Sequence, residues 1–210
     1  MKTGGEYVQY GSGASGPEGW LNFDCSPTLL AQRIPLLGPL IRVWCRTRFD
    51  HAIRFGDIVR GLPVADQSAR AVYCSHVLEH LSLTDLRAAL RNTHRILRPG
   101  GTFRMVLPDL RHIADTYVKD GGSDAALAFM RETRLGREMR ARGLMGLLRS
   151  WLGNSEHLWM WDYPALAREL VEAGFKNPRP VKFNDAADPM FHAAERPDRW
   201  RDALGIECTA

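Results

Sequence analysis

Residues 6–16 read EYVQYGSGASG, a short β-prone run that passes directly into a G-x-G-x-x-G turn at residues 11–16. Glycines in a turn often serve only the turn, but this one follows a predicted strand. Residues 20–24, WLNFD, predict a second strand that ends on Asp24. A glycine loop at the carboxyl end of a strand lets a ligand approach the backbone closely. The stretch therefore predicts a ligand site made of this loop and Asp24.

The spacing of this site separates two kinds of ligand. Asp24 follows Gly11 by thirteen residues, whereas a dinucleotide-binding pattern places its acid about 20 residues after the turn. No full helix fits between Gly16 and Trp20, so a pyrophosphate would lack a helix N-terminus to bind it. The pattern argues against a nicotinamide cofactor.

The rest of the chain predicts an alternation of strands and helices. Ser82 stands at an N-cap position before a helix with an apolar face, which Pro99, Gly100 and Gly101 are expected to end. Pro164 marks the first turn of another helix, which continues over 165–173. Further strands are predicted at 53–57, 69–75, 102–107, 178–183 and 205–209.

Between the fifth and sixth strands, residues 110–153 read as helices and basic loops. Near-continuous apolar strands separated by crossover segments indicate a parallel sheet covered on both faces. We therefore predict a doubly wound α/β fold, with a mostly parallel Rossmann-like sheet and a helical insertion after the fifth strand.

Composition is that of a globular protein with one core: 210 residues, 45% hydrophobic and 25% charged. No apolar run reaches the roughly 20 residues that span a bilayer, and the N-terminus lacks a signal pattern, so we expect a cytoplasmic protein. The four cysteines have no metal-ligand spacing, and we predict reduced core residues and no metal site.

The net charge of +4 is unevenly distributed. Residues 128–150 hold six arginines against two glutamates, and residues 28–49 hold four arginines and no acid. Such stretches favour an anionic partner, either a phosphorylated substrate or an acidic membrane surface. The alternative is that the arginines are merely solvated and that the apolar side of 28–49 packs on the sheet.

Several loose motifs in a fixed order carry a family resemblance. They are G-S-G at 11–13, G-W-L-N-F-D at 19–24, G-D at 56–57, V-L-E-H at 77–80, R-I-L-R-P-G-G at 95–101 and P-D-L at 108–110. Together they resemble the small class I S-adenosylmethionine-dependent methyltransferases, over residues 6–118 and more weakly over 157–207. The sequence departs from the family in having Gln9 and Tyr10 where an acid is usual before the loop, and Ser12 where cysteine is common.

The resemblance implies S-adenosylmethionine as cofactor and assigns positions around it. Gly11 and Gly13 would lie against its methionine part, and Asp24 would bind the ribose. Asp57 and Ile58 would contact the adenine. Ser75 and His76 would lie near the reactive methyl group, whereas Glu79 and His80 are assigned a structural role.

The resemblance also implies a division of the single domain, residues 1–210. The cofactor-binding half is 1–109, a helical lid is 110–162, and a C-terminal helix and strands occupy 163–210. The lid and residues 157–162, HLWMWD, would cover the acceptor, with one of the two tryptophans packing in the core.

Methyl transfer to a hydroxyl requires loss of a proton, for which histidine is the natural base near neutral pH. We expect His76 first and His157 second. The resemblance further implies methylation of a small-molecule or glycan-type acceptor in envelope or polysaccharide biosynthesis. The basic stretches favour an acceptor that is anionic or linked to a lipid. Membrane contact would then be peripheral.

Two alternatives stay open. One is an inactive cofactor-binding partner protein with the same fold, for which the missing acid before the loop leaves room. The other is a nucleic-acid methyltransferase, which is disfavoured because no D/N-P-P-Y/F motif and no separate recognition domain are seen.

Overall fold

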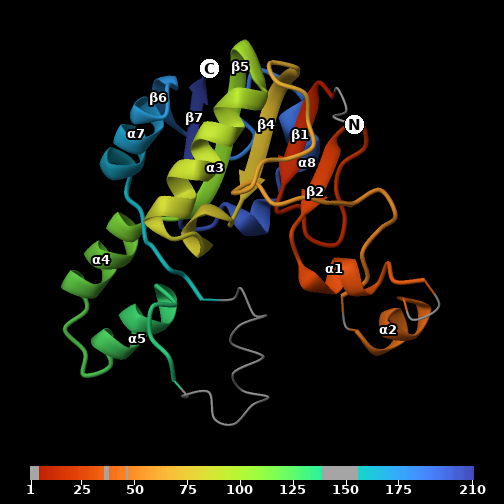
Figure 1. Ribbon diagram of the computed structural model, residues 1–210. Coiled ribbons are helices and arrows are strands. Elements are labelled where there is room, and N and C mark those ends of the chain that lie inside the picture. Colours follow the sequence, from red (N-terminus) through yellow and green to blue (C-terminus); the bar gives the residue numbers. More distant parts are fainter. Residues whose placement is uncertain (1–4, 36–37, 46, 139–155) are drawn as a thin grey trace.

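The computed structural model describes residues 5–35, 38–45, 47–138 and 156–210. Its strands form one seven-stranded sheet in the order β3-β2-β1-β4-β5-β7-β6 (Figure 1). All neighbouring pairs are parallel except those of β7, which is antiparallel to both β5 and β6. The predicted doubly wound, mostly parallel α/β fold is confirmed. The strands are β1 Tyr7–Tyr10, β2 Leu21–Asp24, β3 Arg54–Phe55, β4 Ala69–Ser75, β5 Leu97–Pro108, β6 Lys176–Val181 and β7 Ala203–Thr209.

Capping side chains start most of the helices. Ser82 accepts from the Asp85 amide as predicted, and Ser26, Asp109 and Asp162 cap α1, α4 and α7 in the same way. The helices are α1 Pro27–Ala31, α2 Gly38–Trp44, α3 Leu83–Ile96, α4 Leu110–Lys119, α5 Ala125–Glu132, α7 Tyr163–Glu172 and α8 Met190–Ala194, with short 3₁₀ turns η1 Leu78–His80 and η2 Pro197–Arg199. The helices α1 and α2 and the helices α4 and α5 lie beyond the carboxyl ends of the parallel strands, on opposite sides (Figure 1).

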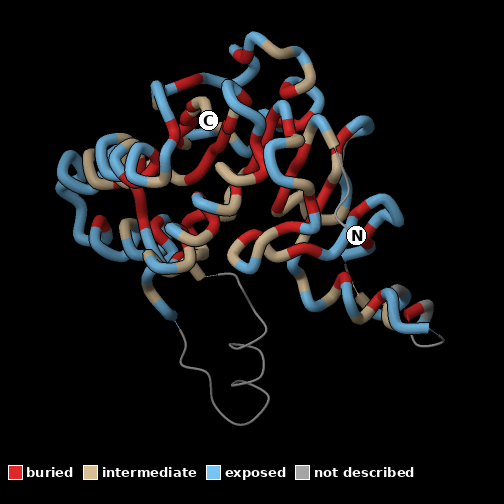
Figure 2. Tube along the Cα trace, turned by 45° about the horizontal axis from the view of Figure 1, so that its top comes forward, coloured by how far each residue is buried: buried red, intermediate tan, exposed pale blue. Residues whose placement is uncertain are grey.

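The inner strands β1, β4, β5 and β7 are largely buried on both faces of the sheet, whereas the edge strands β3 and β6 are mostly exposed (Figure 2). Side chains of alternate residues of β4 pack on opposite faces of the sheet. Val72 and Cys74 pack in the large core with α3 and α7, while Ala71 and Tyr73 pack with Phe191 of α8.

One predicted boundary is wrong. Helix α3 ends at Ile96, and β5 begins at Leu97, whose side chain is buried in the core and draws the chain directly into the sheet. The Pro99-Gly100-Gly101 turn lies inside β5, where the pairing with β4 shifts register after Leu97. A Cβ on Gly101 would lie 2.9 and 3.0 Å from two carbonyl oxygens, so glycine is required there.

All four cysteines are free, but only two are core residues. Cys74 and Cys208 are buried, whereas Cys25 is exposed and Cys45 is intermediate. Cys25 directly follows the last residue of β2, where the chain leaves the sheet and its core. The prediction of core positions therefore holds only for Cys74 and Cys208.

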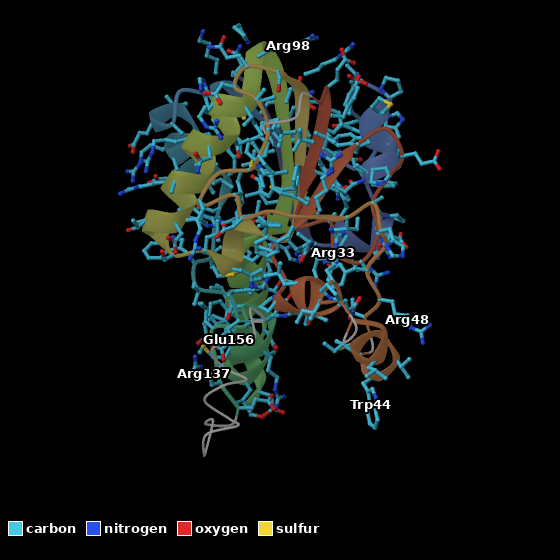
Figure 3. The ribbon with its side chains drawn as sticks, turned by 45° about the vertical axis from the view of Figure 1, so that its right-hand side comes forward. Arg33, Trp44, Arg48, Arg98, Arg137 and Glu156 are labelled. Atoms are coloured by element: carbon cyan, nitrogen blue, oxygen red, sulfur yellow. The ribbon has the colours of Figure 1, made fainter. Side chains whose placement is uncertain are left out.

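In the segment around α1 and α2, most of the large apolar side chains that the structure describes are exposed to solvent. Leu29 is buried against Phe49 and Ile53. Trp44 is 87% exposed and projects from α2, with Arg48 on the same segment (Figure 3). The other exposed apolar residues here are Leu30, Ile34, Leu40 and Val43. The alternative in which the apolar side of this stretch packs on the sheet therefore fails for most of those members that lie within the described residues. None of the helices in the described ranges combines the length and the apolarity that a membrane crossing needs.

A buried arginine fastens the chain after β6 to the centre of the sheet. Arg104 of β5 is fully buried, and its guanidinium donates to the carboxylates of Glu195, Glu207 and Asp185 and to the Lys182 carbonyl. Burial alone would lower the pKa of Arg104, but these carboxylates raise it. The arginine therefore stays charged and joins three segments that are distant in sequence.

Candidate functional site

The six residues predicted to bind the cofactor lie around one cavity of about 440 Å³ at the carboxyl ends of β1, β2 and β4. They are Gly11, Gly13, Asp24, Asp57, Ile58 and Ser75. The cavity also has wall residues that the sequence did not indicate, namely Cys25, Ser26, Pro27, Val77, Leu81 and Arg199.

Gly11 and Gly13 both have a positive φ, but only Gly11 is also crowded by a neighbouring side chain. Gly11 has a φ of +66°, and a Cβ there would lie 2.1 Å from a methyl group of Val77. Gly13 has a φ of +69°, and its missing Cβ would meet no atom within 4 Å. The chain between β1 and β2 forms no helix, so this loop offers no helix N-terminus to the pyrophosphate of a dinucleotide. The loop thus leaves open space where a ligand can approach the backbone.

Backbone amides fix the two acids of this cavity. The Asp24 carboxylate accepts from the Gly13 amide at 3.0 Å and from the Ser26 amide at 2.8 Å. Asp57 accepts from the Val59 amide at 2.9 Å. These bonds leave each carboxylate with further acceptor capacity for a ligand.

A second cavity of about 460 Å³ adjoins the first and shares His76, His80 and Arg199 with it. Its wall includes both predicted catalytic histidines, His76 and His157. Arg199 comes from η2, far along the chain, and no motif around it pointed to the site.

His76 lies at the predicted strand end, and both its ring nitrogens face acceptors. Nδ1 lies 3.2 Å from a carboxylate oxygen of Glu79, and Nε2 lies 2.9 Å from the Arg199 carbonyl oxygen. Burial lowers the pKa of His76, but the contacts with Glu79 and the Arg199 carbonyl outweigh it and raise the pKa. An imidazolium that donates from both nitrogens satisfies this arrangement and has no lone pair with which to act as a base.

His157 has the opposite environment. It is 6% exposed, and its Nδ1 has no hydrogen-bond partner among the described residues. Burial lowers the pKa of His157, against a smaller opposing effect of the Glu79 charge. A neutral ring with a free nitrogen can accept a proton, so the geometry reverses the order of the two candidate bases.

The described part of the lid contains α4 and α5. Of its arginines, Arg131 pairs with Glu138 and Arg137 with Glu156, each at 2.6 Å, the second pair being visible in Figure 3. Arg134 is exposed and lines the second cavity. The remaining arginines of the basic stretch, Arg140, Arg142 and Arg149, lie outside the described residues.

The two tryptophans of the 157–162 stretch differ, as expected for one packing in the core. Trp161 is 3% exposed and belongs to the main core, whereas Trp159 is 43% exposed.

Comparisons with known proteins agree with this architecture. Residues 39–105 match the family model of a methyltransferase domain. No curated protein sequence matches the chain. The methyltransferase-domain match supports S-adenosylmethionine as the cofactor.

Solved structures share the fold at low identity. A chain from the complex of the Haloferax volcanii Trm112 methyltransferase activator with a methyltransferase is 16% identical, with a TM-score of 0.50 over 100% of this chain and 83% of that chain. An S-adenosylmethionine-dependent methyltransferase of Mesorhizobium loti is also 16% identical, with a TM-score of 0.50 over 100% and 93%. One from Archaeoglobus fulgidus is 11% identical, with a TM-score of 0.50 over 100% and 87%. The chain therefore has the fold of the class I S-adenosylmethionine-dependent methyltransferases, and its residues 39–105 are similar to a methyltransferase domain.

Proposed function

We propose that this protein transfers a methyl group from S-adenosylmethionine to a small-molecule or glycan-type acceptor. The observation that carries the proposal is the pair of adjoining cavities at the carboxyl edge of the sheet, which share His76, His80 and Arg199. One holds the glycine loop and two acids, and the other holds His157. Ligands of doubly wound sheets bind at this edge.

The first cavity fits the cofactor. The Asp24 carboxylate can accept from ribose hydroxyls, and Asp57 with Ile58 can contact the adenine. The open face of Gly13 suits the methionine part. The Ser75 hydroxyl lies in the wall of this cavity and can donate a hydrogen bond to the ligand.

The second cavity would place the acceptor. In the transfer, the acceptor oxygen forms a bond to the methyl carbon while the carbon–sulfur bond breaks and its electrons stay on sulfur. The protein's task is mainly alignment of the two reactants. The hydroxyl proton must leave, and we assign its acceptance to His157, which lines this cavity and whose Nδ1 has no partner among the described residues.

The first test is cofactor binding by Asp24→Ala. The substitution should weaken S-adenosylmethionine affinity about 10- to 150-fold, corresponding to 1.5–3 kcal/mol for lost hydrogen bonds to a charged group. Calorimetry measures the change. Glu18→Ala, an exposed acid on the same loop outside the cavity, is the matched control and should bind normally. Unchanged affinity of Asp24→Ala would remove Asp24 from the site.

An anionic acceptor is a narrower proposal, supported by Arg134, Arg199 and Arg201 in the wall of the second cavity. The apparent acceptor affinity should then fall as ionic strength rises, while cofactor affinity changes little. Arg134→Glu should reproduce the loss at low salt in steady-state kinetics. Arg131→Glu is the control, because Arg131 pairs with Glu138 and does not line the cavity.

The same salt dependence could arise at an anionic membrane that presents a lipid-linked glycan of the cell envelope. The exposed apolar residues and arginines of the α1–α2 segment support this version. Sedimentation with phosphatidylglycerol vesicles separates the two, because only membrane docking is lost in Trp44→Ala. If neither salt nor Arg134→Glu changes the apparent acceptor affinity, and the protein does not sediment with the vesicles, the acceptor is neutral. The basic stretches then play no part in binding it.

Acceptor class is best identified with labelled cofactor and cell extract, fractionated into lipid, glycan, nucleic acid and protein. Label in the glycan or small-molecule fraction supports the proposal. Tight cofactor binding with no methyl transfer to any fraction supports the inactive partner protein instead.

A further inference from the structure

Three side chains that can bind metal converge at the wall of the second cavity. Glu79 and His80 belong to η1, and His157 comes from the segment after the lid. Each offers one ligand atom, and these atoms all lie within 4.8 Å of one another. The His80 and His157 rings meet edge to face with centroids 5.0 Å apart.

Backbone hydrogen bonds hold the two segments together. The Leu158 and Trp159 amides donate to the Glu79 carbonyl at 2.8 and 3.2 Å. His80 Nδ1 lies 2.9 Å from the Glu156 carbonyl oxygen. The cluster is therefore positioned by the main chain and does not depend on a surface contact between flexible side chains.

The polar atoms of the cluster are buried and poorly satisfied. Glu79 is fully buried. One of its carboxylate oxygens faces His76 Nδ1 at 3.2 Å, and the other has no hydrogen-bond partner among the described residues. His157 Nδ1 is equally without a partner. Such buried groups are costly unless something binds them.

The histidine rings are oriented as metal ligands usually are. The carbonyl of Glu156 fixes the proton of His80 on Nδ1, which leaves a lone pair on Nε2, 4.0 Å from the Glu79 carboxylate. His157 is hydrogen-bonded to the backbone of Thr133, which leaves Nδ1 free. A hydrogen bond from the second ring nitrogen to a carbonyl is the usual support of a ligating histidine.

We propose that Glu79, His80 and His157 bind a divalent first-row transition metal ion. Two imidazoles and one carboxylate suit zinc, manganese or iron better than calcium or magnesium, which prefer oxygen ligands. The charges of the cavity wall balance, because four carboxylates face three guanidiniums and the His76 imidazolium. The carboxylates are those of Glu79, Glu132, Asp198 and Asp202, and the guanidiniums are those of Arg134, Arg199 and Arg201.

This inference rests on the proposed function only for the role of the ion. An ion at this wall would face the acceptor, and His157 would then serve as a ligand in place of a base. The sequence predicted no metal site, because its ligands come from two segments with no recognisable spacing. Ion binding itself is measured without cofactor or acceptor.

The experiment is calorimetric titration of Zn²⁺ into the full chain after treatment with EDTA and dialysis. We expect one tight site per chain. Glu79→Gln and His157→Gln should each weaken it at least about tenfold. His192→Ala, an exposed histidine on α8, and Cys25→Ser, an exposed thiol, are the controls and should retain the site. Circular dichroism verifies that each variant folds.

Thermal unfolding gives a second readout. Zn²⁺ should raise the melting temperature of the wild-type protein and of both controls, and EDTA should reverse the shift. No tight site in the wild-type protein, or a site that both cluster variants retain, would overturn the proposal. If Zn²⁺ does not bind, the methyl-transfer proposal still stands. That proposal is tested separately by the cofactor affinity of Asp24→Ala, which does not depend on the ion.

Discussion

Replacing His157 with glutamine should lower methyl-transfer turnover by about 10²- to 10⁴-fold, the contribution expected of a well-placed proton acceptor. His157 lines the proposed acceptor cavity, and its Nδ1 has no partner among the described residues. Burial lowers the pKa of the ring, so the neutral form is available. S-adenosylmethionine affinity should stay unchanged, because His157 does not line the first cavity. Steady-state kinetics and calorimetry on the same variant give the two readouts.

His112→Gln is the matched control for this experiment. His112 also comes from the lid, but its side chain is about half exposed and lies 3.7 Å from Asp202. Its turnover should stay within about twofold of wild type, as for a surface substitution. Equal losses in the two variants, or a parallel loss of cofactor affinity in His157→Gln, would make His157 a structural residue. If His157→Gln loses Zn²⁺ binding as well as turnover, His157 is instead a metal ligand.

Replacing Arg104 with methionine should destabilise the protein by about 3–5 kcal/mol, because it leaves buried carboxylates without their counterion. Glu195 is the most affected, since its side chain is as fully buried as that of Arg104. Glu207 and Asp185 each lose an ion pair, at 3.0 and 2.7 Å. Urea unfolding followed by circular dichroism measures the free energy of unfolding.

Arg179→Met provides a matched comparison, because Arg179 pairs with the same Glu207 from the protein surface. An exposed ion pair contributes at most about 1 kcal/mol, so this variant should unfold close to wild type. Arg104→Met should also reduce methyl transfer, since the segment that Arg104 fastens leads into η2 and Arg199. If the two substitutions cost the same, the buried network contributes no more than the surface pair.

Much of the fold could be predicted from local sequence. Apolar runs predicted the inner strands, because residues buried on both faces of a sheet leave a near-continuous hydrophobic pattern. The edge strands β3 and β6 are mostly exposed, and β6 begins at Lys176, two residues before its predicted start. Ser82 predicted the start of α3 correctly, because a cap depends only on residues a few positions away. The end of α3 was mispredicted, since it depends on the burial of Leu97 in the tertiary core.

The convergence of the candidate cofactor-binding residues was also predictable. Gly11, Gly13 and Asp24 lie in one loop and its flanking strand, and Ser75 ends another strand of the same sheet. The carboxyl ends of parallel strands lie at one edge, so a strand prediction brings these residues together. The six predicted positions do line one cavity.

By itself, the sequence therefore determined the α/β alternation, the glycine loop and the identity of the acids at the strand ends. Tertiary structure alone decided what each histidine faces. His76 meets the Arg199 carbonyl, 123 positions away, and His157 meets η1 across the lid. Whether a ring nitrogen donates, accepts or stays free depends on such distant partners and on burial, neither of which leaves a periodic signal in the sequence. The buried network of Arg104 has the same origin, because its three carboxylates meet only when the last two strands close on the sheet.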